Sequence, residues 1–430
     1  MIKNEMEEKL MGKNKPFIIV LIIAMMMTLV LGGCGGAAET PDTGEEPAGE
    51  VIIGYVGPMT GPSATMGMAT KQGAELAIEE INGAGGIMGS TIKFVTRDDE
   101  ADPTKSKTAV EELIDKEKVQ MMIGQPNSTS VAAAEDYVNE NKIIQILNIA
   151  TNTLLVDAEK YPYTFRTFFP SPVQAEALVN IAKEAGFKKI VLLGDTTALG
   201  NDGIASLQKA CEAAGVTPVE AITYKSGDAD MTPVAEKIKK AEADCILAWT
   251  LGADGAKIVA ALSRIDYMDE LIYLGYTGLS LPNFRELAGE GIDRCYTING
   301  LWSVDQAAGE TQLDDARQEL YDKMVEKYGK YGPGGRTTAP QMVASGYDAI
   351  YLYKWAVETA GTFDSDAVKE TIETKIADYP SKIGYADAYR FSPTNHEAIS
   401  GKDLVPVLLD PMMTTDNIFG DVYIRGSFQK

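Results

Sequence analysis

The feature that most constrains the fold is a regular alternation of strand-like runs with helix-length segments, which begins at Val51. The first run, 51–56, is rich in β-branched residues, and apolar residues then recur at helical spacing over 74–81. Further strand-like runs lie at 92–95, 119–123, 143–147, 189–194, 219–224, 245–250 and 271–275. Strands that alternate with helices form parallel sheets with right-handed crossovers. We therefore predict an α/β fold, and this number of strands favours two doubly wound domains over one.

The amino-terminal part has the pattern of an export segment. Lysines precede an apolar run, 17–31, which is too short for a typical membrane-spanning helix. Small residues then stand directly before Cys34, which resembles the lipobox of bacterial lipoproteins, where the signal is cut before a lipidated cysteine. We expect a signal peptide over 1–33, a lipid anchor at Cys34 and a disordered acidic tether over 34–50. An uncleaved anchor is the alternative, and it would also leave the chain outside the cytoplasm.

Composition excludes several functions. The formal charge of -23 argues against nucleic acid and against electrostatic binding to anionic lipid headgroups. The only histidine, His396, lies in a loop rich in Pro and Asn, without a second His or paired Cys nearby. Zinc binding and Ser-His catalysis are therefore poorly supported, and we expect His396 to be structural or exposed. We expect no cofactor, no metal and no enzymatic activity.

The remaining cysteines do not form a metal-binding pattern. Cys211, Cys245 and Cys295 are odd in number and widely spaced. One disulfide outside the cell is an alternative, but we expect small buried thiols.

The stretch 121–130 is predicted to be a buried strand, a tight turn and the start of a helix. Asn127 and Ser128 are residue types preferred at helix N-caps. The first amides of a helix have no intrahelical acceptor and carry the positive end of its dipole. A small anion can bind at such a helix start beyond the carboxyl end of a strand. The alternative is that Ser128 simply caps the helix.

Small or hydroxyl-bearing residues follow four other predicted strands in the same way. They lie at 148–152, 194–197, 249–252 and 275–278. Ligands of doubly wound sheets bind outside the carboxyl ends of the strands, and clefts between domains are preferred sites. The five strand ends together therefore predict a polar cleft.

Several motifs in order resemble one known family. They are 55–62, 73–82, 85–87, 98–99, 163–167 and 346–349, and the resemblance covers essentially 51–400. The chain resembles the branched-chain amino acid (Leu/Ile/Val) binding proteins, which are type I periplasmic binding proteins that serve ABC importers. This resemblance implies two Rossmann-like lobes joined by three crossings, with a small-molecule ligand between them and importer permease subunits as partners. We expect a monomer.

The resemblance also implies lobe boundaries and an anion site. One lobe would contain 51–167 plus 300–382, and the other 168–299 plus 383–430. The family holds the ligand carboxylate with a serine after the third strand and a threonine after the fourth. These positions fall on Ser128 and on Ala150 and Thr151 in this chain.

Other positions depart from the family pattern. Thr277 stands where family members place an acid that pairs with the ligand ammonium, and a buried ammonium without an anionic partner costs several kcal/mol. Met66, Leu199 and Met342 stand where the family has aromatic residues. Three further candidates for the ligand site, each of which could equally belong to the core, are Trp249, Trp302 and Tyr276. The expected site therefore binds a carboxylate at one end and is unusually apolar elsewhere.

We therefore expect a lipid-anchored extracytoplasmic receptor that delivers a branched-chain or other hydrophobic amino acid to an ABC importer. A hydrophobic carboxylic acid without the ammonium group, aliphatic or aromatic, is one alternative ligand. A ligand sensor for a membrane signalling protein is an alternative function. A cell-surface hydrolase is disfavoured by the scarcity of His and of metal-ligand clusters.

Overall fold

The computed structural model describes most of the chain after Ala48. The described residues are 49–61, 63–279, 283–299, 315–329, 340–381, 389–397, 404–408 and 421–422. The predicted export signal, Cys34 and the predicted tether up to residue 48 lie outside the described residues. Within the described ranges, no helix is both long and apolar enough to cross a membrane.

The first sheet has five parallel strands in the order β2-β1-β3-β4-β5. The strands are β1 Glu50–Gly57, β2 Thr91–Asp98, β3 Met121–Ile123, β4 Ile144–Leu147 and β5 Thr164–Arg166. All residues of β3, β4 and β5 are buried, because helices cover both faces of the sheet. This explains why these runs are continuously apolar or uncharged up to Arg166 instead of alternating.

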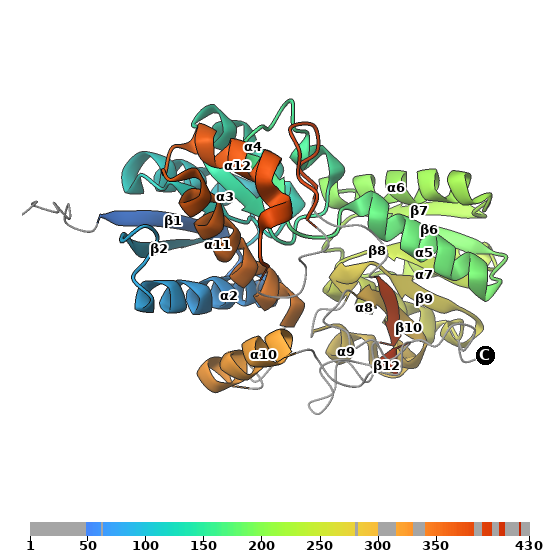
Figure 1. The fold of residues 1–430 in the computed structure, drawn as a ribbon. Helices are drawn as coiled ribbons and strands as arrows, with labels where there is room; N and C mark the ends of the chain where they lie inside the picture. The colour runs from blue at the N-terminus through green and yellow to red at the C-terminus, as the bar shows by residue number, and fades with distance from the viewer. Residues whose placement is uncertain are drawn as a thin grey trace, which may run out of the picture. The chain divides into compact units, whose positions relative to one another are not determined.

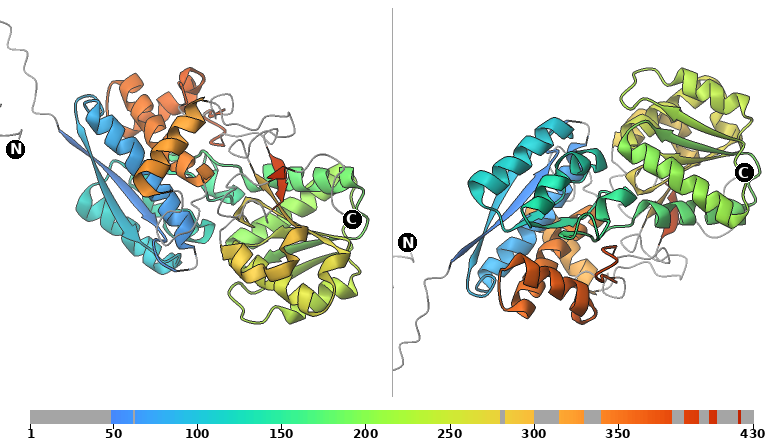
Figure 2. Two further views of the ribbon diagram at one scale, coloured as in Figure 1. Left: turned by 90° about the horizontal axis from the view of Figure 1, so that it is seen from below. Right: turned by 90° about the horizontal axis from the view of Figure 1, so that it is seen from above.

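Two sets of helices cover the first sheet (Figures 1 and 2). One face packs against α2, α11 and α12, and the other packs against α3 and α4. The helices are α2 Ala64–Gly83, α3 Pro103–Glu112 with the π-helix η1 Leu113–Glu117, α4 Ser128–Glu140, α10 Asp315–Tyr328, α11 Pro340–Ala360 and α12 Ser365–Lys375 followed by η7 Ile376–Asp378. The sequence did not predict α12, whose buried Val368 and Ile372 form a short apolar stripe.

Glycines allow α2 and α11 to approach closely. A Cβ added to Gly73 would lie 1.9 Å from the carbonyl oxygen of Val343, and one added to Gly346 would lie 2.4 Å from that of Thr70. Both distances are far below van der Waals contact with rigid backbone. The contact between these two helices therefore depends on residues without a side chain, one on each helix.

The second sheet has seven strands in the order β12-β11-β10-β9-β8-β6-β7. The strands are β6 Ile190–Asp195, β7 Glu220–Tyr224, β8 Cys245–Trp249, β9 Ile272–Gly275, β10 Cys295–Asn299, β11 Val405–Leu408 and β12 Asp421–Val422. The strands from β7 to β10 are parallel, whereas β11 and β12 add an antiparallel edge. Mixed sheets of this kind are common in doubly wound folds.

Helices also cover both faces of the second sheet (Figure 2). α5 Ser171–Ala185 and α6 Ala198–Ala214 pack on one face, and α7 Thr232–Lys240, α8 Gly252–Arg264 and α9 Asn283–Ala288 pack on the other. Short helical turns complete the connections: η2 Thr153–Val156, η3 Met268–Glu270, η4 Thr277–Leu279 and η5 Gly289–Arg294. The predicted fold class, α/β with two doubly wound parallel sheets, is confirmed.

The segment Tyr389–Glu397 returns to the first sheet. The backbone N–H of Arg166 donates to the carbonyl of His396 at 2.9 Å, and the His396 ring stacks on Phe165 with centroids 4.1 Å apart. The ring nitrogens of His396 contact the carbonyl of Thr164 at 2.9 Å and the carboxylate of Glu373 at 3.1 Å. Burial lowers the pKa of His396. The prediction that this residue is structural is confirmed.

The cysteines behave as small apolar residues. Cys211, Cys245 and Cys295 are buried and free. Burial raises the pKa of the Cys211 thiol to about 11, so it stays protonated at neutral pH. The prediction of buried thiols is confirmed.

Candidate functional site

A cavity lies at the carboxyl ends of strands from both sheets. Residues that follow β3, β4, β5, β6, β8 and β9 line it, together with one residue each from α2 and α11. The lining residues are Met66, Pro126, Asn127, Ser128, Ile149, Ala150, Thr151, Phe168, Leu199, Leu251, Tyr276, Thr277, Gly278 and Met342. Eight of the ten candidate residues named from the sequence are therefore brought together here, whereas Trp249 is not among them and Trp302 lies outside the described residues.

The start of α4 forms the polar end of the cavity. Asn127 is the N-cap residue but makes no capping side-chain hydrogen bond, and Ser128 is the first helical residue. The Ser128 hydroxyl therefore does not cap the helix, as the alternative reading had it. Its Oγ instead accepts a hydrogen bond from the N–H of Asn152 at 3.3 Å. The first intrahelical bond runs from Val131 N to Asn127 O at 3.0 Å, so the preceding amides have no intrahelical acceptor. We call Ser128, Thr151 and these amides the anion site.

Two polar side-chain atoms on lining residues have no hydrogen-bond partner among the described residues. They are Oγ1 of Thr151, a residue that is only 3% exposed, and Oδ1 of Asn127. A buried polar atom without a partner costs about 1–3 kcal/mol, so native proteins rarely keep one without a reason. A bound ligand with complementary groups would supply the missing partners.

Thr277 lines the cavity but is already bonded within the protein. Its N–H and its hydroxyl both donate to Oε1 of Gln174, at 3.1 and 2.9 Å. Gln174 in turn donates to the carbonyl of Phe169 at 2.7 Å, so α5 fixes the turn after β9. No local pattern in the sequence marks Gln174, which lies in the first turns of α5, far from Thr277 in the chain.

Among the described residues that line the cavity, none is Asp, Glu, Lys, Arg or His. Asp195 ends β6 but is not a lining residue, and its Oδ1 accepts from the N–H of Thr197 at 2.8 Å. Over the described ranges, no three or more His, Cys, Asp or Glu residues cluster as a metal site would require. The lining residues that the structure describes can therefore recognise charge only through dipoles, hydroxyls and amides.

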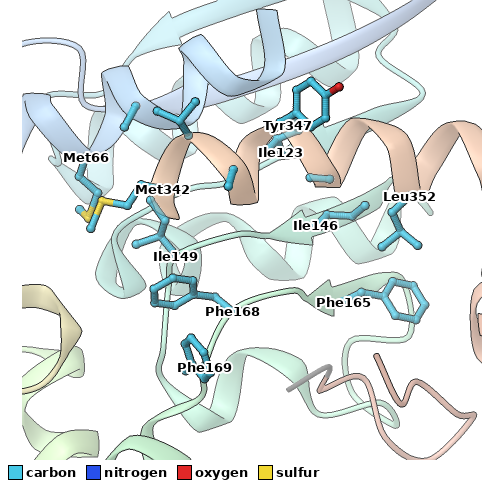
Figure 3. Packing of buried hydrophobic residues seen from close by; sticks show 14 of the residues in the cluster. Met66, Ile123, Ile146, Ile149, Phe165, Phe168, Phe169, Met342, Tyr347 and Leu352 are labelled. Carbon is cyan, nitrogen blue, oxygen red and sulfur yellow. The ribbon is translucent and has the colours of Figure 1, made fainter. Parts of the chain in front are cut away.

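Apolar side chains form the rest of the wall. Figure 3 shows Met66 from α2 and Met342 from α11 pointing toward one another, with Ile149 and Phe168 beside them. Leu199 and Leu251 contribute from the side of the second sheet. The unbranched thioethers of the two methionines can adapt to ligands of different shape.

Trp249 is the exception among the predicted residues. Its ring is fully buried and stacks on Tyr276 with centroids 4.5 Å apart and planes 12° apart. A Cβ added to Gly203 would lie 2.0 Å from the Trp249 ring, so the tryptophan is packed tightly against α6. Tyr276 therefore lines the cavity, and Trp249 supports it from behind. Burial raises the pKa of Tyr276, which stays a neutral phenol.

Comparison with known proteins identifies the class of this fold and site. The arrangement of two parallel sheets around an apolar cavity with a helix start is that of the type I solute-binding proteins. The model of the periplasmic binding protein family matches residues 50–407, and the chain belongs to this family. Members of the family bind solutes and are not enzymes, which confirms the absence of enzymatic activity predicted from the sequence.

Individual relatives are distant but cover most of the chain. The Leu/Ile/Val-binding protein homolog 3 of Brucella melitensis biotype 1 is 26% identical over 319 residues, which span 74% of this chain and 81% of the relative. The periplasmic binding protein type 1 structure from Bordetella pertussis Tohama I has a TM-score of 0.73 at 23% identity, and the match covers 84% of this chain and 96% of that chain.

Two similar structures contain ligands of different chemistry. The branched-chain amino acid transporter substrate-binding protein LivJ of Streptococcus pneumoniae is in complex with isoleucine, with a TM-score of 0.67 at 22% identity over 83% of this chain and 95% of that one. A solute-binding protein of an ABC transporter from Rhodopseudomonas palustris BisB5 is in complex with 3,4-dihydroxybenzoic acid, with a TM-score of 0.68 at 21% identity over 84% and 93%. Both ligands carry a carboxyl group.

Proposed function

We propose that this chain is the extracytoplasmic solute-binding protein of an ABC importer and captures a branched-chain or other hydrophobic amino acid. The observation that carries this proposal is the cavity itself, which has the anion site at the start of α4 at one end and apolar side chains along the rest of its wall. The Leu/Ile/Val-binding relatives and the isoleucine complex support the same ligand class.

The ligand carboxylate would bind at the anion site. The amides at the start of α4 point along the helix axis and favour negative charge. The hydroxyls of Ser128 and Thr151 add two donors, and Thr151 Oγ1 has no other partner in the described protein. A site of this kind can bind an anion by local geometry, without a cationic side chain among its described residues, although the net charge of the chain is negative.

Among the described lining residues, the ammonium group of an amino acid would meet only neutral acceptors. Asn127 Oδ1, an oxygen without a partner in the described protein, is one such acceptor. The absence of charged residues from the described lining favours a second candidate ligand, a hydrophobic carboxylic acid without an ammonium group. The dihydroxybenzoate complex of a structural relative fits that candidate.

A thermal-shift and calorimetry panel tests both ligands. Leucine, isoleucine and valine are compared with 4-methylpentanoate, the deaminated analogue of leucine, and with benzoate, since a ligand stabilises by RT ln(1 + [L]/Kd). Leucine that binds more tightly than 4-methylpentanoate supports the amino acid, and the reverse order supports the carboxylic acid. If no compound of the panel shifts the melting temperature or gives a binding isotherm, the proposed function is wrong.

The variant Thr277→Glu separates the two candidates further. A carboxylate at this position would face a ligand ammonium in the cavity, so the variant should improve leucine binding relative to 4-methylpentanoate. Thr277→Gln, which adds similar volume without charge, is the matched control. If leucine already binds tightly and Thr277→Glu does not improve its binding, the argument that an ammonium partner is missing is wrong.

We further propose a lipid anchor at Cys34, importer permease subunits as partners and a monomeric state. The lipobox-like sequence before Cys34 supports the anchor, and mass spectrometry of the mature amino terminus tests it. We keep the two-lobe division as a proposal, with one adjustment. The contacts of Tyr389–Glu397 with β5 favour placing this segment with the first lobe, so that the last part of the second lobe starts after Glu397 and not at residue 383.

A further inference from the structure

Arg166, the last residue of β5, is fully buried beside the loop that carries Thr151. Its guanidinium donates from Nη1 to the carbonyl of Thr151 at 2.5 Å and from Nη2 to the carbonyl of Asn152 at 2.6 Å. The rigid planar fork of arginine can bond two successive carbonyls at once, which a single ammonium group does not do. These contacts fix the orientation of two consecutive peptide units.

The opposite sides of the same two peptides face functional groups. The C=O and N–H of a trans peptide point in opposite directions, and neither peptide here is cis. The N–H of Asn152 therefore points away from Arg166 and donates to Ser128 Oγ at 3.3 Å. The N–H of Thr153 lies 3.3 Å from both carboxylate oxygens of Asp202 on α6.

We propose that Arg166 is a positioning residue for the ligand site, because it turns the loop after β4 so that Asn152 N–H and Thr151 Oγ1 face the anion site. The same two contacts present Thr153 N–H to Asp202, which joins the loop to α6 beside the second sheet. This inference rests on the proposed function for its ligand, but the orientation of the loop exists without one.

The acidic residues near Arg166 do not hold the loop after β4, whereas the two Nη groups of its guanidinium do. Glu397 lies 3.5 Å from Nε, at the long end of an ion pair, and Glu135 is the other acid near the guanidinium. Neither contacts the loop carbonyls. The carbonyl of Thr151 also accepts from the N–H and Oγ of Ser171, both at 2.9 Å. The carbonyl of Asn152 also accepts from the backbone N–H of Leu155, at 3.3 Å, which is longer than its 2.6 Å bond from Arg166.

The test uses Arg166→Lys and Arg166→Met in the purified full chain, with Glu397→Gln as the matched control that keeps the fork. Amide hydrogen exchange of Asn152 and Thr153 without ligand reports the loop directly. Calorimetry with leucine and 4-methylpentanoate measures ligand affinity. The matching primary amide, 4-methylpentanamide, shows whether recognition of the carboxylate itself is affected. A purely structural loss would weaken acid and amide equally.

Both arginine variants should speed exchange at the two amides by roughly tenfold or more and weaken carboxylate binding by roughly 10- to 100-fold, the effect of misplacing a binding group by about 1 Å. The ratio of the affinities for 4-methylpentanoate and 4-methylpentanamide should fall as carboxylate binding weakens. The exchange rates and affinities of Glu397→Gln should stay near those of the wild type. If Arg166→Met does not fold, Arg166→Lys decides. Wild-type exchange in Arg166→Lys, or an equal effect of Glu397→Gln, would overturn the proposal. A wild-type chain that binds no probe refutes the proposed function instead, and the exchange result still stands.

Discussion

Replacing Thr151 by valine should affect folding and binding in opposite directions. Valine keeps the shape of threonine and removes only Oγ1, the buried atom without a partner in the described protein. Loss of such an atom should leave the free energy of unfolding of the ligand-free protein unchanged or raise it by about 1 kcal/mol. Loss of a hydrogen bond to a ligand carboxylate should cost about 1.5–3 kcal/mol of binding free energy, or roughly a 10- to 150-fold rise in Kd.

Urea unfolding of the ligand-free protein and calorimetry with the tightest ligand of the panel measure the two effects. Thr151→Ser is the control, because it keeps the hydroxyl and loses one methyl group, worth about 0.8 kcal/mol or roughly fourfold in Kd. A valine variant that binds normally and unfolds more easily would show that Oγ1 serves the fold, and the assignment of Thr151 to the anion site would then be wrong.

Three further predictions concern the helix start, a buried acid and the helix contact. Ser128→Ala should weaken carboxylate binding by roughly 1.5–3 kcal/mol in calorimetry, and unchanged affinity would remove Ser128 from the anion site. Burial raises the pKa of Glu135 to about 9, so the folded protein holds this proton more tightly than the unfolded chain and its contribution to stability falls as pH rises from about 5 to 9. Glu135→Gln should therefore gain stability relative to wild type over that range, by up to about 1.4 kcal/mol per pH unit in urea unfolding, whereas parallel pH curves would contradict the shift. Gly346→Ala should lower the free energy of unfolding by about 1–3 kcal/mol, because its Cβ would meet Thr70 O at 2.4 Å, while Gly83→Ala, with open space around it, should not; equal effects would refute the packing argument.

The sequence predicted those features that depend on residues close together in the chain. Strand runs such as 245–250 and 271–275 have strong local apolar patterns, and β8 Cys245–Trp249 and β9 Ile272–Gly275 lie where they were expected. Ser128 follows a strand and starts a helix, so its place at the start of α4, the kind of position where an anion can bind, follows from the chain itself. Parallel sheets then bring the carboxyl ends of their strands together without further information.

The contacts that join distant segments were not predictable in this way. Gln174 bonds Thr277 across about a hundred residues, and Arg166 bonds a loop that precedes it by fifteen. Neither residue has a local pattern that marks it, because a buried polar side chain acquires its role only from what folding places beside it. Trp249 shows the converse. Its position at a strand end suggested that it lines the cavity, but in the structure it packs behind Tyr276.

Under the proposed function, the two ends of the ligand would be recognised by different kinds of structure. A carboxylate needs several donors that converge on one point, and a helix start with an adjacent hydroxyl supplies them from consecutive residues. An ammonium without a charged partner needs neutral acceptors, and Asn127 Oδ1 is such an oxygen on a lining residue. Neutral acceptors discriminate less sharply between an ammonium and a hydrogen atom in its place than a carboxylate does, because only the carboxylate leaves an unpaired charge when the ammonium is missing. A cavity whose described lining has no charged side chain should thus show a smaller affinity difference between leucine and 4-methylpentanoate than a relative with an acid at the position of Thr277.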